Sequence, residues 1–423
     1  MAERTVFIHL PEATAAVPAG RLSMAENGIE VRASRFAYGR RYVQRPQAVP
    51  VDPISLPLGE GDDADFVPVN GLALFGALRD ATPDSWGRRV IENKLRAPPN
   101  GLPEWRYMDE AGPYRAGALD IRHGPEDGVT HGSLPGILDL RYLHEAAERI
   151  VDGEPVPARL ASFFEGGPSV GGARPKAVIQ VDGHEWIAKF PAKDDRFDIP
   201  LVEFATLKLA RRAGLNVPPI RLETLPDGRN IMLIQRFDRQ ATPFGIARRH
   251  MVSALTMLGL HERDSPDANY GAIADALGIY GVSGRIAGDR EELFARMVFN
   301  ILVSNDDDHL RNHAFLYESG GWRLSPLYDV VPKPQVALER TLHLGVGRYG
   351  RSATLDNALS GAGWFGLLVP NASRIADRVI RTVREWRAVF EEAGATTGQC
   401  DTIASAFRRA GDIGGREVER HLA

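Results

Sequence analysis

The chain has 423 residues, of which 43% are apolar and 25% charged, which is typical of globular proteins with two or three core-bearing units. Its formal net charge of -4 excludes an overall basic field that would draw it to nucleic acid or anionic lipid. A single cysteine, Cys400, excludes a disulfide framework and a cysteine-rich zinc module, and favours a cytoplasmic protein.

The N-terminal third is expected to open as β structure and to continue with helices. Residues 5–10 and 29–38 have the apolar patterns of strands. The sequence Thr82-Pro83-Asp84-Ser85 predicts a capped helix start, with Trp86, Val90, Ile91 and Leu95 facing inward. A proline- and glycine-rich stretch at 97–113 indicates a subdomain boundary, and one apolar face predicts a helix over 140–150.

The central region is expected to form a small β-rich lobe. Residues 177–181 and 185–190 flank the turn Asp182-Gly183, and residues 220–225 and 231–237 predict a second hairpin. A helix is predicted between the hairpins, from Leu201 to Ala213, ended by Gly214. Beyond this lobe the patterns turn helical, notably over residues 293–303 and 375–390.

The most informative segment is NDDDHLRN, from Asn305 to Asn312. Three consecutive aspartates beside an apolar helix are costly to desolvate unless a cation or a donor compensates them. A protein-kinase catalytic loop needs an Asp to accept the substrate proton, an Asn five residues later to hold magnesium, and a second metal-binding Asp beyond a short hairpin. Asp307 and Asn312 have this separation, and Asp329 follows such a hairpin.

Other interpretations of this segment remain open. An acidic triplet is often a solvated helix end, and Asp306 or Asp308 is an alternative base. His309 and His313 have the i, i+4 spacing of a zinc pair, but Leu310 stands where a zincin requires Glu. A structural role for His309 is therefore favoured over zinc binding.

A glycine-rich segment, GGPSVGGARPK at 166–176, precedes the first central hairpin. It lacks the P-loop and dinucleotide-binding patterns, so a plain turn is the alternative to a phosphate cradle of backbone amides. Lys189, in the strand-like WIAKF, is placed as a strand lysine that contacts nucleotide phosphates. Glu203 on the next helix is either its partner or a solvated side chain.

Two further segments have a weaker signal. Residues 233–239 close the small lobe and would form the connector against which an adenine ring lies. A basic group is more typical of a solvated strand face than of a DNA contact; it consists of Arg32, Arg35, Arg40, Arg41 and Arg45.

The chain carries six short segments in a fixed order: SVGGARPK (169–176), WIAKFP (186–191), GLNVP (214–218), QRFDR (235–239), DDHLRN (307–312) and SPLYDVVP (325–332). Together they resemble the HipA family of serine/threonine-protein kinase toxins of type II toxin-antitoxin systems. TPDSWGRRV (82–90) and AGAL (116–119) are similar to that family's N-terminal domain.

The resemblance implies an α+β, protein-kinase-like two-lobe fold with a β-rich N-terminal subdomain and an all-helical C-terminal lobe. The expected parts are an N-terminal subdomain over 1–125, a kinase N-lobe with phosphate loop and hinge over 126–240, and a C-lobe with the catalytic loop over 241–423.

The resemblance also implies residue roles. Asp307 is expected to be the catalytic base, and Asn312 and Asp329 to hold Mg2+. Ser169 matches a serine that the family autophosphorylates, and Gln235 stands in the hinge where many relatives carry Glu. The residues expected to contact ATP are Ser169, Val170, Gly171, Gly172, Lys176, Lys189, Gln235, Phe237 and Asp238.

Two functions from different classes fit the chain. One is an ATP- and Mg2+-dependent serine/threonine-protein kinase that phosphorylates a cellular protein, expected to belong to the translation machinery, and limits itself by autophosphorylation. The other is a silent relative that acts as partner or co-repressor of a DNA-binding antitoxin. The presence of Lys189, Asp307, Asn312 and Asp329 favours the enzyme, and a small-molecule kinase is a further alternative.

The resemblance also implies a partner, a helix-turn-helix antitoxin of HipB type, through which DNA contact would be mainly indirect. No membrane partner is expected, because the N-terminal residues lack the apolar segment of a signal peptide and the densest apolar run, 297–303, is too short to span a bilayer.

Overall fold

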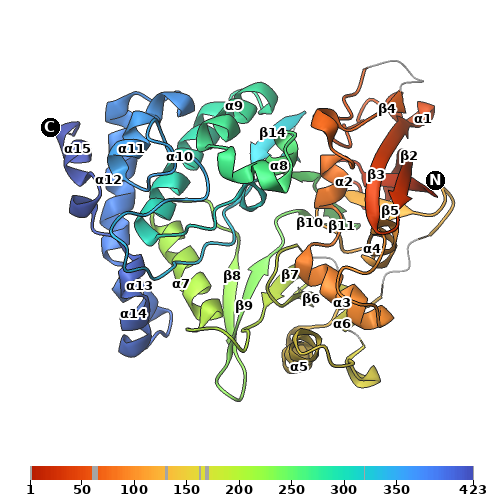
Figure 1. Cartoon of the computed structure of the whole chain (residues 1–423), viewed down its shortest axis with the longest axis horizontal. Helices are drawn as coiled ribbons and strands as arrows, with labels where there is room; N and C mark the ends of the chain where they lie inside the picture. Colours follow the sequence, from red (N-terminus) through yellow and green to blue (C-terminus); the bar gives the residue numbers. More distant parts are fainter. Residues whose placement is uncertain are drawn as a thin grey trace. The chain divides into compact units, whose positions relative to one another are not determined.

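The computed structural model describes residues 2–59, 65–128, 132–161, 163–166, 171–318 and 320–422. The chain divides into two compact units, Met1–Asp194 with Glu223–Val252, and Asp195–Leu222 with Ser253–Ala423 (Figure 1). Residues 195–222, which we expected in the N-lobe, thus group with the C-terminal part of the chain.

The first unit opens with a five-stranded sheet in which each strand pairs antiparallel with its neighbours. The two strands predicted from the sequence are confirmed, and Val6, Ile8 and Phe36 on them are fully buried. The order is β4-β3-β2-β1-β5, made of β1 (Ala2–His9), β2 (Ala16–Asn27), β3 (Glu30–Tyr38), β4 (Asp65–Phe66) and β5 (Leu119–Arg122).

Short helices accompany this sheet. The predicted capped helix is α3 (Ser85–Leu95), whose N-cap Asp84 accepts a hydrogen bond from the Ser85 amide at 3.0 Å. Trp86 and Val90 share a core with residues of α5 (Leu140–Val151) and of the central strands. The other helices of this unit are α1 (Arg40–Val43), α2 (Gly76–Asp80), α4 (Glu104–Glu110) and α6 (Phe163–Gly166).

The central sheet has the order β6-β7-β9-β8, and its two predicted hairpins are confirmed. Asp182 (φ 50°) and Gly183 (φ 78°) adopt the left-handed backbone that the turn between β6 and β7 requires. These strands are β6 (Lys176–Val181), β7 (His184–Lys189), β8 (Ile220–Thr224), which crosses into the second unit, and β9 (Asn230–Gln235), followed by β10 (Arg239–Thr242), β11 (Gly245–Arg248) and β12 (Met251–Ser253).

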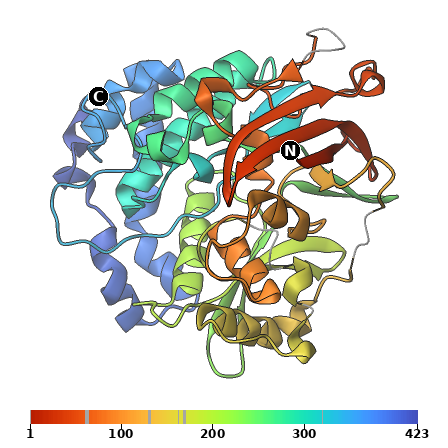
Figure 2. The same ribbon diagram turned by 45° about the vertical axis from the view of Figure 1, so that its right-hand side comes forward.

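The second unit is mainly helical and also contains the hairpin of β13 (Ala314–Glu318) and β14 (Gly321–Leu324) (Figures 1 and 2). Its central helix is α10 (Ile286–Val303), in which every residue from Leu293 onward is buried. The other helices are α7 (Ile199–Arg212), α8 (Ala254–Met257), α9 (Tyr270–Tyr280), α11 (Leu355–Ser360), α12 (Val369–Arg384), α13 (Trp386–Glu392), α14 (Thr397–Ile403) and α15 (Gly415–Arg420).

Packing explains why α7 belongs to the second unit. Leu201, Val202 and Ala205 on α7 share a core with Phe390 and Ile403 of the C-terminal helices.

The helix predicted over 375–390 is divided between α12 and α13.

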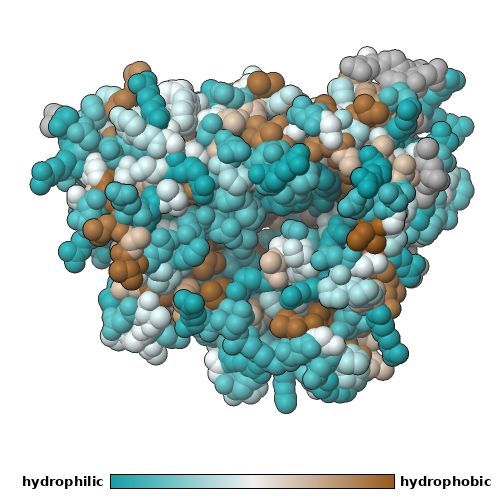
Figure 3. Space-filling model, viewed as in Figure 1, coloured by the Kyte–Doolittle hydropathy of each residue, from teal (hydrophilic) through white to brown (hydrophobic). Residues whose placement is uncertain are grey.

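The surface and the helices add two observations. On the face seen in Figure 3, hydrophilic residues predominate and apolar ones are scattered. Within the described residues, no helix is both long enough and apolar enough to cross a membrane.

Candidate active site

The acidic segment begins where α10 ends. Ser304 closes this helix in a left-handed conformation (φ 53°, ψ 43°) that turns the chain away from the helix axis. The buried Asn305 then folds back, because its side-chain amide donates to Asn300 Oδ1 at 3.1 Å and its backbone amide to the Asn300 carbonyl at 3.0 Å. The three aspartates therefore leave a rigid helix end.

Asp308 is the buried member of the triplet, with 1% of its surface exposed. The Tyr270 hydroxyl donates to its Oδ2, and the His343 backbone amide donates to its Oδ1 at 2.8 Å. Burial raises the pKa of Asp308 to about 7, although these hydrogen bonds oppose the shift. Its carboxyl group is thus engaged inside the unit.

The other two aspartates differ in their partners. Asp306 is half-buried, accepts a hydrogen bond from Gln335 Nε2 at 2.8 Å and pairs with Lys333 at 3.1 Å. Asp307 is the exposed member. Asp307 is therefore the most exposed of the three aspartates.

Asn312 lies on the same loop and contacts Asp307 directly. Its Nδ2 donates to the Asp307 backbone carbonyl at 2.7 Å, which orients the amide group so that Oδ1 is the atom of this side chain that could hold a cation. The Asn312 side chain belongs to the 3-10 turn Leu310–Asn312, which leads into β13. The spacing between Asp307 and Asn312 in the sequence thus corresponds to a direct hydrogen bond between the two residues.

Asp329 has a left-handed backbone (φ 59°), a conformation that Asp tolerates better than most residues and that is enriched at functional sites. The preceding backbone is held at Leu327, whose amide donates to the Asn216 carbonyl at 2.7 Å. The Tyr328 hydroxyl donates to the Arg311 carbonyl at 2.7 Å. Through this bond the structure brings the Asp329 segment beside the catalytic-loop segment.

His309 and His313 lie in the same region. Burial lowers the pKa of His313 to about 3, so its ring is neutral, and it packs edge-on against Tyr270 at 5.3 Å between ring centres. Within the part of the chain that the structure describes, no three His, Cys, Asp or Glu side chains gather as metal ligands do. A magnesium-nucleotide site needs no such gathering, because one Asn, one Asp and phosphate oxygens suffice.

The glycine-rich loop belongs to the first unit, and its described end is anchored to the start of α3. The Gly172 amide donates to Asp84 Oδ2 at 3.0 Å, and the Trp86 amide donates to the Gly172 carbonyl at 3.0 Å. Gly172 has φ 95°, and a Cβ there would lie 2.5 Å from Lys176 Nζ. Lys176 Nζ donates to the Gly171 carbonyl at 2.7 Å. Ser169 and Val170, predicted to contact ATP, lie outside the described residues.

The predicted phosphate-binding lysine lies on β7 of the central sheet. In the register of the sheet, Lys189 faces Lys176 of β6 on one side and Met232 of β9 on the other, and it is half-buried. Glu203 is buried on α7 in the second unit, so its pairing with Lys189 stays a prediction.

A buried ionic group, the hinge cluster, surrounds the connector after β9; it consists of Arg236 and Asp238 of the connector, Arg239 at the start of β10 and Glu185 of β7. Asp238 pairs with Arg236 at 2.7 Å and Arg239 at 2.8 Å. Its Oδ2 also accepts a hydrogen bond from the Gly117 amide at 2.7 Å. Burial alone would raise the pKa of Asp238, but the two guanidinium charges outweigh burial and hold it well below the usual range.

This geometry corrects one expectation. We expected the Asp238 carboxylate to contact the nucleotide, but it forms ion pairs with Arg236 and Arg239 inside the hinge cluster. Gln235 and Phe237, on either side of Arg236, are half-buried, and their place in an adenine-binding hinge stays a prediction. Neither the hinge cluster nor the role of Asp84 as an anchor of the glycine loop was predicted, although the alternating charges of Arg236, Asp238 and Arg239 were a signal for the hinge cluster.

Two members of the predicted basic group, Arg32 and Arg35, lie on β3 of the N-terminal sheet and form surface ion pairs. Arg32 pairs with Glu30 at 2.9 Å and Arg35 pairs with Asp65 at 2.8 Å, with all four side chains at least half exposed. These two arginines have the character of a solvated strand face.

Comparisons with known proteins place these features in context. The family model described as the HipA-like C-terminal domain matches residues 168–387. A protein of Sinorhizobium fredii designated as a kinase is 26% identical over 297 residues, which cover 64% of this chain and 67% of that protein. The serine/threonine-protein kinase toxin HipA of Shewanella oneidensis is 26% identical over 298 residues, which cover 61% of this chain and 66% of that protein. The chain thus matches about two thirds of the length of these relatives.

A solved structure covers almost the whole chain. The Shewanella oneidensis MR-1 HipA in a complex with HipB and operator DNA superposes with a TM-score of 0.67 at 19% sequence identity, covering 99% of this chain and 97% of that chain. This likeness confirms the expected α+β two-lobe fold class.

Proposed function

The chain belongs to the HipA-like family, because the model of that family's C-terminal domain matches more than half of it, and from this premise we propose that it is an ATP- and Mg2+-dependent serine/threonine-protein kinase. The observation that carries the proposal is the division of the aspartate triplet. Asp306 and Asp308 are engaged by other residues, whereas Asp307 is exposed beside the Asn312 amide. This is the arrangement that a kinase base and its neighbouring metal ligand require.

In this proposal the residues of the second unit perform the chemistry. Asp307 accepts the proton of the attacking serine or threonine hydroxyl. Asn312 Oδ1 and the Asp329 carboxylate would hold Mg2+, for which an all-oxygen donor set is suited. The metal would supply charge neutralisation at the phosphate oxygens.

The residues of the first unit bind the nucleotide in this proposal. Lys189 and the glycine loop receive the phosphates, and Gln235 and Phe237 receive the adenine ring. The Gly172 amide is bound to Asp84 in this structure, so it has to exchange that partner before it donates to a phosphate. Asp238 contributes by fixing the connector rather than by touching ATP.

We further infer the partner and the substrate class. A helix-turn-helix antitoxin of HipB type is the proposed partner, supported by the complex in which the Shewanella HipA was solved with HipB and operator DNA. The proposed substrate is a cellular protein, with the translation machinery as the first class to examine. The cytoplasm is the proposed compartment.

Asp329→Asn is expected to lower the affinity for ATP in the presence of magnesium by at least about tenfold, or ~1.4 kcal/mol, because the substitution removes the fixed charge nearest the proposed cation. Calorimetric titration with ATP, with and without magnesium, measures this. The matched control is Asp275→Asn, on an exposed position of α9, which should bind as wild type does. Magnesium-independent binding that Asp329→Asn leaves unchanged would refute the assignment.

Autophosphorylation at Ser169 is expected to switch the enzyme off. A phosphate there adds about -1.5 to -2 charges and competes for the backbone amides proposed to hold ATP. Wild-type protein incubated with ATP and magnesium should gain one phosphate on Ser169 and then bind ATP poorly. Mass spectrometry of intact protein and peptides checks this beside Asp307→Asn, and equal modification in both proteins would show that the reaction is not self-catalysed.

A further inference from the structure

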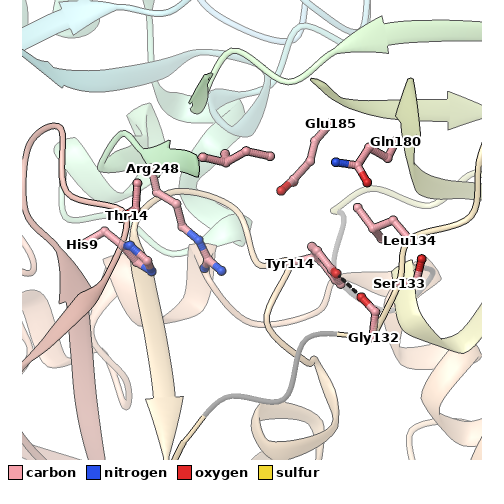
Figure 4. Close-up of a pocket in the computed structure, with 10 residues that line it drawn as sticks. His9, Thr14, Tyr114, Gly132, Ser133, Leu134, Gln180, Glu185 and Arg248 are labelled. Carbon is pink, nitrogen blue, oxygen red and sulfur yellow. Dashed lines mark hydrogen bonds between the residues drawn. The ribbon is translucent and has the colours of Figure 1, made fainter. Parts of the chain in front are cut away.

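A cavity of about 280 Å³ lies inside the first unit (Figure 4). Its described lining includes His9, Thr14, Gln180, Glu185 and Arg248, contributed by strands of both sheets, by the segment after β1 and by β11. None of its lining residues is one assigned above to ATP or magnesium. The cavity is therefore a feature that the proposed kinase chemistry does not use.

Arg248, at the end of β11, is the unusual member of this lining. It is 7% exposed, and its Nη1 atom is buried without a hydrogen-bond partner among the residues that the structure describes. Figure 4 shows its guanidinium group pointing into the space between His9 and Tyr114. Burial lowers the pKa of Arg248, but an arginine keeps its charge at neutral pH.

Asp120, Glu185 and Asp238 favour the charge of Arg248, but burial outweighs their attraction, and all three carboxylates are already paired with other arginines. Within the hinge cluster, Glu185 and Asp238 are each engaged by both Arg236 and Arg239. The next buried carboxylate, Asp120, accepts a contact from Arg122 at 2.9 Å and one from Arg115 at 3.7 Å. The hinge cluster and its buried neighbours hold four guanidinium groups against three carboxylates: Arg115, Arg236, Arg239 and Arg248 against Asp120, Glu185 and Asp238.

His9 does not change this balance. Burial lowers its pKa to about 3, with the charges of Arg248 and Arg239 adding to the effect, so the imidazole is neutral. Its Nδ1 is also buried without a partner among the described residues. A buried cation beside a second unpartnered polar atom is a costly arrangement unless something else occupies the space.

We propose that this cavity binds a small organic anion whose carboxylate or phosphate group pairs with Arg248. A guanidinium group forms charge-assisted, bidentate bonds with either kind of head group. Gln180 and Thr14 offer further polar contacts, and Leu134 and Ile246 offer apolar surface for a short carbon body. A cavity of this volume suits a ligand on the order of ten non-hydrogen atoms, at the small end of ligand pockets.

The test is a binding measurement on the full chain with three probes: sodium phosphate, sodium butyrate and sodium phenylphosphate, each compared with sodium chloride at equal ionic strength. At least one probe is expected to raise the melting temperature of wild type and to give a saturable calorimetric isotherm, with affinity lowered at least about tenfold in Arg248→Gln. Arg249→Gln, which removes the neighbouring half-exposed arginine bonded to Gln240, should bind as wild type does. The three probes distinguish a bare phosphate from a head group that needs an organic body.

Two binding results would overturn the proposal. The first is that none of the three probes shows saturable binding at millimolar concentration. The second is that wild type and Arg248→Gln bind the probes equally well. A further variant addresses folding directly. If Arg248 is a buried cation whose proper partner is the ligand, the melting temperature of Arg248→Met without added anion should equal or exceed that of wild type. A lower melting temperature in Arg248→Met would show that Arg248 serves the fold alone and would also overturn the proposal.

Discussion

Asp307→Asn is expected to lower turnover by about two to four orders of magnitude, the range typical of losing a positioned base. The exposed carboxylate is the proposed proton acceptor, and Asn keeps its size without its basicity. Fold and ATP affinity should stay near wild type, because Asn312 bonds the backbone carbonyl of Asp307 rather than its side chain. The initial rate of γ-phosphate transfer from radiolabelled ATP to heat-treated host extract measures turnover, and a melting curve measures the stability of the fold. Calorimetric titration with ATP and magnesium measures the affinity.

The matched control for this variant is Asp306→Asn. Asp306 is already bound by Gln335 and Lys333, so its loss should leave turnover within a few-fold of wild type. If Asp306→Asn lost activity and Asp307→Asn retained it, the base would be Asp306. Asp308 is the less suitable replacement, since Tyr270 and His343 hold its carboxyl group inside the unit.

Asp238→Ala is expected to lower the free energy of unfolding by about 3 to 5 kcal/mol, the usual effect of removing one partner of a buried ion pair. The substitution leaves Glu185 as the carboxylate that Arg236 and Arg239 share, and it removes the hydrogen-bond acceptor of the Gly117 amide. This is a large share of the ~5 to 15 kcal/mol that separates typical folded and unfolded domains. Urea unfolding followed by tryptophan fluorescence measures the change.

The control here is Asp227→Ala, which removes an exposed acid that pairs with Arg229 at the surface and should leave stability near wild type. Equal stability of the two variants would contradict the role assigned to the hinge cluster. Because the pKa of Asp238 is depressed, its stabilisation is fully present above the ordinary Asp pKa of about 3.9 and is lost as the pH falls below that value.

Local signals predicted much of the fold. The capping residue Asp84 correctly indicated the start of α3, and the turn residues Asp182-Gly183 correctly indicated the hairpin of β6 and β7. The strand β2 was missed, because Pro18 and Gly20 are typical of loops. Gly20 is needed there for a tertiary reason, since a Cβ would lie 2.4 Å from the Ala37 carbonyl of the paired strand.

The helix α4 was also missed, because it lies inside the proline- and glycine-rich stretch that indicated a boundary. Its apolar residues Tyr107 and Met108 are buried, but seven residues are too few to display a helical period. Tertiary packing, rather than local preference, decides such a short element.

Motif spacing singled out Asp307, Asn312 and Asp329 as candidates and favoured Asp307 over Asp306 and Asp308, but it did not predict how the surroundings of the three aspartates differ. The surroundings of Asp308 depend on Tyr270 and His343, which lie 38 and 35 residues away from it in the chain. The position of Asp238 depends on Gly117, at a separation of 121 residues. Such long-range contacts leave no local pattern in the sequence, so motifs could supply candidate residues but not the surroundings of each group.

The central claim, that this chain transfers phosphate to a cellular protein through Asp307, is tested most directly by phosphoproteomics after brief induction. Strains expressing wild type and Asp307→Asn at equal levels of folded protein are compared. The account predicts new phosphoserine or phosphothreonine sites on one or a few host proteins in the wild-type strain, and their absence in the Asp307→Asn strain. Identical phosphoproteomes in the two strains would contradict it.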